Sequence, residues 1–195
     1  MEHAATGVAL TASLASLWVA IATERANEKM VAAASWPFVQ IDTSNTDTQG
    51  NSTLAFNVNN AGVGPAKIET FEVMWNGKAY PTSYALLAAC CGFKPTSFKP
   101  TPEHPTAPPG SLLTGGVMGT VLRAGETRAF ITYAIGGDNG AVWAALDEAR
   151  RKAISYRICY CSVFDECWQD EIGNVSIIRP KPVDRCEMPS VPYTE

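Results

Sequence analysis

Twenty consecutive residues near the N-terminus, Ala4–Thr23, carry no charged side chain. A helix of this length reaches about 30 Å, which matches the hydrocarbon core of a bilayer. We therefore expect a transmembrane helix that stays attached and contacts the lipid bilayer through these residues. A cleaved signal peptide is the main alternative, because Ala20-Ile21-Ala22 has the small-x-small form of a cleavage site. A buried helix of a soluble domain is the third.

The helix is expected to continue beyond this apolar segment. Residues 24–35 contain neither Gly nor Pro and are rich in helix formers, and Pro37 favours an end soon afterwards. The sequence thus predicts a transmembrane helix with a helical stalk over residues 1–35. Residues 36–195 remain, and their length of about 160 residues suits one domain with a single core.

Seven segments of the second domain have the composition of short β-strands, with β-branched or aromatic residues bounded by Gly, Pro, Asn or Asp. They are residues 38–41, 53–58, 68–75, 117–122, 127–134, 154–163 and 167–178. This series predicts a mainly β fold, an immunoglobulin-like β-sandwich. Two short helices, 82–89 and 139–152, are expected to interrupt it. Residues 60–65 and 123–126 have the composition of turns, in which glycine allows positive φ, and a structural role is expected for their glycines.

All six cysteines lie in the second domain. An even number beyond a membrane segment indicates disulfides in an oxidising compartment, such as the periplasm. A hairpin turn at 162–166 would set Cys161 opposite Cys167, so we predict a disulfide between them. Cys159 faces the same side of its strand as Cys161 and can reach a more distant partner. The sequence does not choose among the remaining cysteines, Cys90, Cys91 and Cys186.

Two other interpretations of the six cysteines stay open, reduced thiols and a zinc site. Arg25 and Lys29 follow the apolar segment and no basic residue precedes it, which favours a cytosolic domain with reduced cysteines. A zinc site is less favoured, because C-x-x-C is absent and the C-x-C places two sulfurs on one strand. The histidines, His3 and His104, lie in the N-terminal tail and in a proline-rich segment. We therefore expect no metal and no other cofactor.

The chain shows no catalytic signature. A catalytic triad would have to be built on His104, and no G-x-S-x-G or other nucleophile motif accompanies it. We therefore expect a protein that is not an enzyme. The net charge of −4 and a sequence pI of about 5.2 leave no basic stripe to follow a phosphate backbone, so nucleic acid is not expected as a partner.

The segment 94–110 contains six prolines and is expected to form an extended loop. Its P-x-x-P spacings are typical of polyproline ligands, which makes it a candidate site for a protein partner. Phe98 would be the apolar anchor of that contact, and His104 would add a pH-sensitive one. The alternative is a rigid surface loop in which Phe98 packs back onto the domain.

Four motifs carry a resemblance to a group of proteins: residues 34–40, 56–68, Cys90-Cys91 and 160–168. With them the chain resembles small bacterial single-span membrane proteins that carry an immunoglobulin-like β-sandwich. Its Asn-x-Gly-x-Gly-Pro-Ala piece is also similar to bacterial immunoglobulin-like adhesion modules. The resemblance implies an architecture and no activity. We expect a membrane-anchored interaction or envelope-structural module, with a small-ligand or metal sensor and an enzyme of unrecognised type as alternatives.

Overall fold

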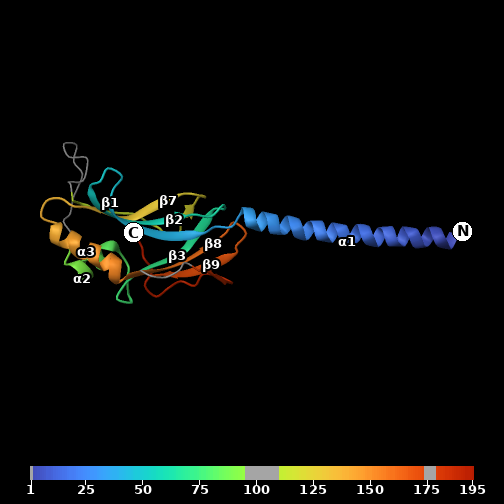
Figure 1. The fold of residues 1–195 in the computed structure, drawn as a ribbon. Coiled ribbons are helices and arrows are strands. Elements are labelled where there is room, and N and C mark those ends of the chain that lie inside the picture. The colour runs from blue at the N-terminus through green and yellow to red at the C-terminus, as the bar shows by residue number, and fades with distance from the viewer. Residues whose placement is uncertain (1, 95–109, 174–178) are drawn as a thin grey trace, which may run out of the picture.

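The computed structural model of the protein describes residues 2–94, 110–173 and 179–195. Two β-sheets pack face to face, and their apolar side chains fill the space between them. Helix α1 (Glu2–Ala34) projects from one end of this sandwich, whereas α2 (Ser83–Cys91) and α3 (Gly140–Lys152) lie at the other (Figure 1). The expected mainly β, two-sheet domain is therefore confirmed.

The strands of each sheet are antiparallel. The first sheet has the order β1-β2-β7-β5, made of β1 (Val39–Thr46), β2 (Ser52–Asn60), β7 (Thr127–Ala134) and β5 (Leu112–Thr114). The second has the order β10-β9-β8-β3-β4, made of β10 (Lys181–Val183), β9 (Cys167–Ile172), β8 (Ile154–Cys161), β3 (Ala66–Trp75) and β4 (Lys78–Tyr80). The short β6 (Val121–Leu122) also pairs with β3.

The order of the seven main strands follows a known pattern. With β4, β6 and β10 set aside, the first, second, fifth and fourth strands in chain order form one sheet, and the third, sixth and seventh form the other. This is the A-B-E-D and C-F-G arrangement of an immunoglobulin constant-type sandwich. The correspondence is one of strand order.

The expected transmembrane helix over Ala4–Thr23 is corrected by the structure. In the described part of the chain, no helix is long and apolar enough to cross a membrane. From residue 13 to the end of α1, every stretch of 18 residues includes Glu24, Arg25, Glu28 and Lys29, whose charges are costly in a bilayer. The helix does continue past the apolar segment as expected. It is a single element that projects from the sandwich.

Three predicted strands are shorter than expected. In the segment 117–122, Gly119 takes a φ of +72° and leaves just two residues, Val121 and Leu122, as a strand. β8 stops at Cys161, where the turn begins, and β9 stops at Ile172. The remainder of the predicted last strand includes residues 174–178, which lie outside the described residues.

Both predicted short helices are present. Thr82 caps α2, where its Oγ1 accepts a hydrogen bond of 3.1 Å from the backbone N–H of Ala85. On α3, Leu146 and Ala149 are buried where the helix packs on α2 and β8. Asn139 precedes α3, but its side chain makes no cap hydrogen bond. It binds backbone groups of the adjoining loops instead, at Gly136, Gly110 and Ala134.

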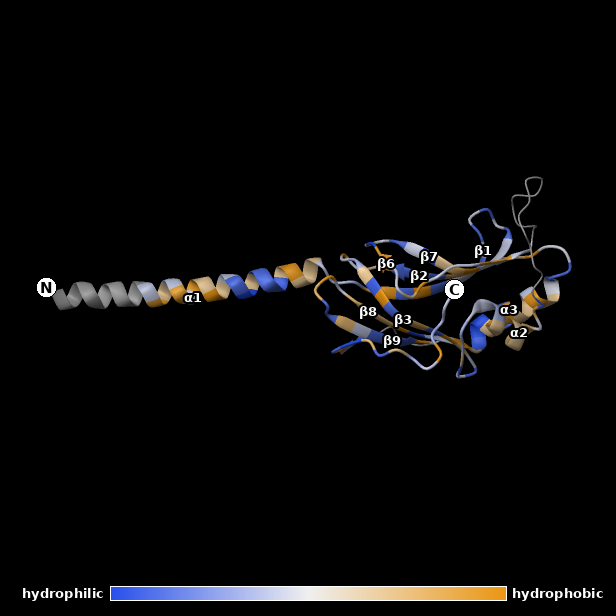
Figure 2. Ribbon diagram, turned by 180° about the vertical axis from the view of Figure 1, so that it is seen from behind, coloured by the Kyte–Doolittle hydropathy of each residue, from blue (hydrophilic) through white to orange (hydrophobic). Residues whose placement is uncertain are grey.

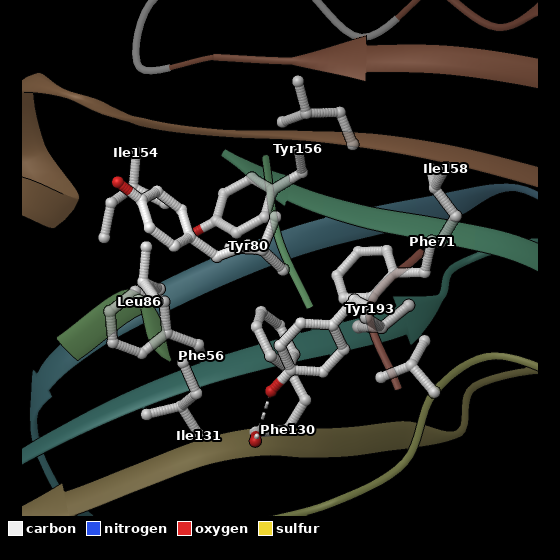
Figure 3. Close-up of a cluster of buried hydrophobic side chains, with 14 of the residues drawn as sticks. Phe56, Phe71, Tyr80, Leu86, Phe130, Ile131, Ile154, Tyr156, Ile158 and Tyr193 are labelled. Carbon is white, nitrogen blue, oxygen red and sulfur yellow. Dashed lines mark hydrogen bonds between the residues drawn. The ribbon is translucent and has the colours of Figure 1, made fainter. Parts of the chain in front are cut away.

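An aromatic cluster forms the centre of the core (Figure 3). The ring of Phe71 on β3 lies 5.1 Å from that of Phe130 on β7, and the edge-to-face arrangement joins the two sheets. Tyr193 completes the cluster, with its ring 5.5 Å from Phe71 and 5.8 Å from Phe130. It is fully buried, although it is the third residue from the end of the sequence.

Tyr193 belongs to residues 184–195, which we call the C-terminal strap. The strap follows β10, and Cys186 bonds it to Cys159 on the solvent-facing side of the second sheet. It then reaches the far edge of β3, where the N–H of Tyr193 donates to the carbonyl of Phe71 at 2.8 Å. The Tyr193 hydroxyl hydrogen-bonds the Ser83 hydroxyl and lies 3.5 Å from the carbonyl of Phe130. The strap is therefore held both outside and inside the sandwich.

Candidate functional site

Helix α1 carries a stripe of exposed apolar side chains. Leu14, Leu17, Trp18 and Ile21 follow the i, i+3, i+4, i+7 spacing that places residues on one helix face, and they are 40–72% exposed. Figure 2 shows this apolar section followed by a hydrophilic one nearer the sandwich. We call these four residues the apolar stripe. Because isolated helices are marginal in water, an apolar face of this kind is normally covered by a partner.

The hydrophilic section of α1 has acidic and basic residues side by side. Glu24 and Glu28 are four residues apart, and so are Arg25 and Lys29, which gives two adjacent rows of opposite charge. Within the described residues, none of these four side chains forms an ion pair with another part of the chain. The rows are thus available to a second molecule.

The end of the sandwich next to α1 is also apolar. Five large apolar side chains are 44–63% exposed there. They are Trp36, Val63, Val121, Val163 and Phe164. They come from the α1–β1 junction, the β2–β3 loop, β6 and the β8–β9 turn. The N–H of Val63 in the loop donates a hydrogen bond of 3.0 Å to the carbonyl of Trp36 in the junction. We call this surface the apolar end.

A groove of about 750 Å³ connects α1 with the apolar end. One face of the helix, from Ala20 to Ala32, forms its long wall, and Phe164 and Glu166 of the β8–β9 turn close it. Glu24 and Glu28 lie on the same wall, so the groove is both apolar and acidic. The groove thus joins the acidic row of α1 to Phe164 of the apolar end.

The β2–β3 loop fixes the base of α1. A Cβ atom on Gly64 would lie 1.9 Å from the carbonyl oxygen of Ser35, and one on Gly62 would lie 2.3 Å from the backbone nitrogen of Phe38. Neither glycine uses the positive φ that a turn glycine allows, whereas Gly125 does, at +75°. Gly62 and Gly64 are required for close approach of two backbones.

Asn60 holds the same junction by hydrogen bonds. Its side chain is completely buried, and its Oδ1 accepts from the N–H groups of Phe38 and Gly62. Its Nδ2 donates to the carbonyls of Gly64 and Leu122, at 2.7 and 3.1 Å. The amide thus ties β6 and the β2–β3 loop to the start of β1. It fixes the direction in which α1 leaves the sandwich.

We expect Gly64→Ala to lower the free energy of unfolding by about 1–3 kcal/mol, the usual cost of overpacking a closely packed site. The added methyl group overlaps the backbone at Ser35, so the junction must shift. Equilibrium denaturation of the full chain measures the change. Gly140→Ala is the matched control, since nothing lies within 4 Å of the added Cβ and its φ is not positive. Equal stability of both variants would contradict this role of Gly64.

The described cysteines form three disulfides. Cys161 and Cys167 are bonded, with an S–S distance of 2.03 Å, as the hairpin predicts. The structure also resolves the pairings that the sequence left open. Cys159 is joined to Cys186, and Cys90 to its neighbour Cys91 at the end of α2.

Two of these disulfides lie against each other. Cys161 and Cys167 are directly opposite in the β8–β9 pairing, and Cys159 faces the same side two residues earlier. The Sγ atoms of Cys161 and Cys186 are 3.9 Å apart, and those of Cys161, Cys167 and Cys186 all lie within 4.8 Å of one another. We call Cys159, Cys161, Cys167 and Cys186 the cysteine cluster. It is covered by the strap and largely buried.

A positive charge lies next to the cysteine cluster. Lys67 on β3 is the cross-strand neighbour of Cys161, and its Nζ is paired with the carboxylate of Asp165 in the β8–β9 turn. This hydrogen bond raises the pKa of Lys67 above its ordinary value. The sequence analysis did not single out Lys67, whose proximity depends on the pairing of β3 with β8.

The proline-rich segment is outside this description. Phe98 and His104 lie among residues 95–109, which are not part of the described residues. Their expected contact with a protein partner therefore stays a prediction. Helix α2, which precedes that segment in the chain, lies at the end of the sandwich opposite to α1 (Figure 1).

Comparison of the chain with protein-family models, with curated proteins and with solved structures finds no match. The resemblance to small bacterial single-span proteins stays an expectation.

Proposed function

We propose that the protein is an interaction module that associates with further copies of itself through α1. The observation that carries this proposal is the exposed apolar stripe on a helix that projects from a well-packed domain. All described side chains of residues 13–31 are exposed. Since a helix gains most of its stability by burying an apolar face, an uncovered stripe favours assembly.

The chemistry of the stripe supports another helix as the partner. Burying a large apolar side chain contributes about 1.5–3 kcal/mol, so a few such residues from each copy would offset part of the cost of association. No charged residue lies between Ala4 and Thr23, so nothing repels a second copy along this stretch. Trp18 is 72% exposed and supplies the largest side chain of the stripe.

The charged rows support self-association over a partner of unlike sequence. When two copies of α1 lie side by side, the Glu24 and Glu28 row of one can face the Arg25 and Lys29 row of the other. Such pairing sets the register of helices more than it adds affinity. The neighbouring apolar end would then bring the sandwiches into contact beside the bundled helices.

The disulfides support a location outside the cytosol. Three disulfides in one domain of this size are typical of proteins in oxidising compartments. We therefore retain the expectation of an extracytoplasmic, for instance periplasmic, domain as part of the proposal. In that setting an assembling module would serve adhesion or envelope structure.

We expect the full chain to self-associate, and Trp18→Ser to weaken this association about 30-fold or more, as loss of a central interface tryptophan costs about 2 kcal/mol. Sedimentation velocity over a range of concentrations measures the effect. Val19→Ser is the matched control, because Val19 is also exposed on α1 but faces away from the stripe. Valine and serine have similar helix propensities.

Two outcomes would overturn the proposal. One is a full chain that stays monomeric at every concentration. The other is an equal loss of association for Trp18→Ser and Val19→Ser, which would mean that no particular face of α1 is used.

A further inference from the structure

The cysteine cluster has the ligands for a metal ion. We propose that the chain, once its two adjacent disulfides are reduced, binds one Zn²⁺ through the thiolates of the cysteine cluster. Four thiolates are a complete ligand set for tetrahedral Zn²⁺. The sequence disfavoured a zinc site because C-x-x-C is absent and the C-x-C places two sulfurs on one strand. The structure adds Cys167 from β9 and Cys186 from the strap.

The sulfur positions are close to those that zinc requires. With Zn–S bonds of about 2.3 Å, neighbouring sulfurs of a tetrahedral site lie roughly 3.8 Å apart. The Sγ atoms of Cys161 and Cys186 are 3.9 Å apart, and that of Cys167 lies within 4.8 Å of Cys186. Two bonded pairs, Cys159–Cys186 at 2.02 Å and Cys161–Cys167 at 2.03 Å, would each have to separate by about 1.8 Å, which side-chain rotation can supply.

The backbone frame of the site does not depend on the disulfides alone. Cys159, Cys161 and Cys167 lie on the paired strands β8 and β9, which are held by ladder hydrogen bonds. The strap that carries Cys186 is held separately by Tyr193 in the core and by its hydrogen bond to Phe71. Reduction therefore leaves the four thiols near one another.

The surroundings suit a site of negative charge. A zinc ion with four thiolates has a net charge of −2, and Lys67 lies beside Cys161 in the same cross-strand row. Cys159, Cys161 and Cys167 are 1–8% exposed, so water has little access to their sulfurs. Lys67 would shift part of its interaction from Asp165 to the thiolates.

The chemistry has two steps. First, a reductant gives two electrons to each S–S bond. A phosphine takes the oxygen of a water molecule, whose two protons complete the two thiols, and leaves as phosphine oxide. A dithiol supplies its own two protons and leaves as its disulfide. Zn²⁺ then replaces the four thiol protons, which are released to solvent as the four Zn–S bonds form.

Cobalt titration of the full chain tests the proposal. The chain is reduced with a phosphine without oxygen and titrated with Co²⁺, a spectroscopic substitute for Zn²⁺. We expect one equivalent to produce the thiolate-to-cobalt charge-transfer and tetrahedral bands, and Zn²⁺ to remove them. Cys186→Ser should weaken binding more than about 100-fold, since even outer-shell changes cost roughly 10–100-fold. The control Cys90→Ser/Cys91→Ser removes the other two thiols and should bind normally.

Folding is checked by the near-UV circular dichroism of the reduced chain and by its melting temperature, which Zn²⁺ should raise. Absence of the tetrahedral bands would overturn the proposal. So would bands that Cys186→Ser leaves unchanged, or bands that the Cys90→Ser/Cys91→Ser variant loses. Binding by a reduced chain without native near-UV signal would also overturn it, because the metal would then be held by an unfolded chain.

Discussion

Replacing Tyr193 with alanine is expected to lower the free energy of unfolding by about 4 kcal/mol, within the range for deleting a large buried aromatic side chain. Its ring fills the centre of the core between Phe71 and Phe130, and nothing nearby replaces it (Figure 3). For a chain of this length, the melting temperature should fall by about 10 °C. Denaturant titration and differential scanning calorimetry measure both quantities.

Two further variants separate the contributions of Tyr193. Tyr193→Phe keeps the ring but leaves Ser83 without its hydroxyl partner, so we expect a loss of about 1–2 kcal/mol. Thr194→Ala changes the exposed next residue and should have little effect, because its backbone N–H still donates to Pro81. A loss below about 1 kcal/mol for Tyr193→Ala would show that the strap is not part of the folding unit.

Removing the Cys159–Cys186 disulfide by a double serine variant should cost about 3.5 kcal/mol in the chain-entropy account. The bond closes a loop with a sequence separation of 27 residues, which it constrains in the unfolded chain. The Cys161–Cys167 bond, with a separation of 6, should contribute about 2 kcal/mol by the same relation. Thermal denaturation of the oxidised variants measures which disulfide contributes more to stability.

The Cys90→Ser/Cys91→Ser variant is the control for this series. Its bond joins neighbours and closes no long loop, so its loss should change stability least. Hydrogen exchange adds a local test: without the Cys159–Cys186 bond, the amide of Tyr193 should exchange faster than amides of β2. Equal stability losses for all three variants would contradict the loop-length order.

Features built from neighbouring residues were predictable from the sequence. The alternation of apolar residues predicted most strands, and the turn at 162–166 predicted the Cys161–Cys167 disulfide. The hairpin of β3 and β4 was missed although Asn76-Gly77, with φ of 49° and 76°, is a strong signal for a two-residue turn.

Features that depend on distant contacts could not be read from the chain. Tyr193 follows a segment with no strand or helix pattern, and only the packing of both sheets shows that it enters the core. Cys186 had several possible partners until the strap placed it over β8. Gly62 looked like a turn glycine because the approach of the α1–β1 junction is invisible in the local sequence. The apolar segment was assigned to a bilayer from its length and its lack of charge, but in the described part of the chain no helix is long and apolar enough to cross a membrane.

Asn60, Gly62 and Gly64 hold the base of α1, so a small change of angle there produces a large displacement at the other end of the helix. A helix of 33 residues is about 50 Å long, so a tilt of about 10° at its base would move its tip by roughly 9 Å. That displacement is close to the distance between two packed helices, about 8–10 Å. A flexible base would therefore let the tip of α1 move from one neighbouring helix to the next. The stiffness of a few buried backbone contacts thus sets the angular tolerance with which distant ends of such molecules meet.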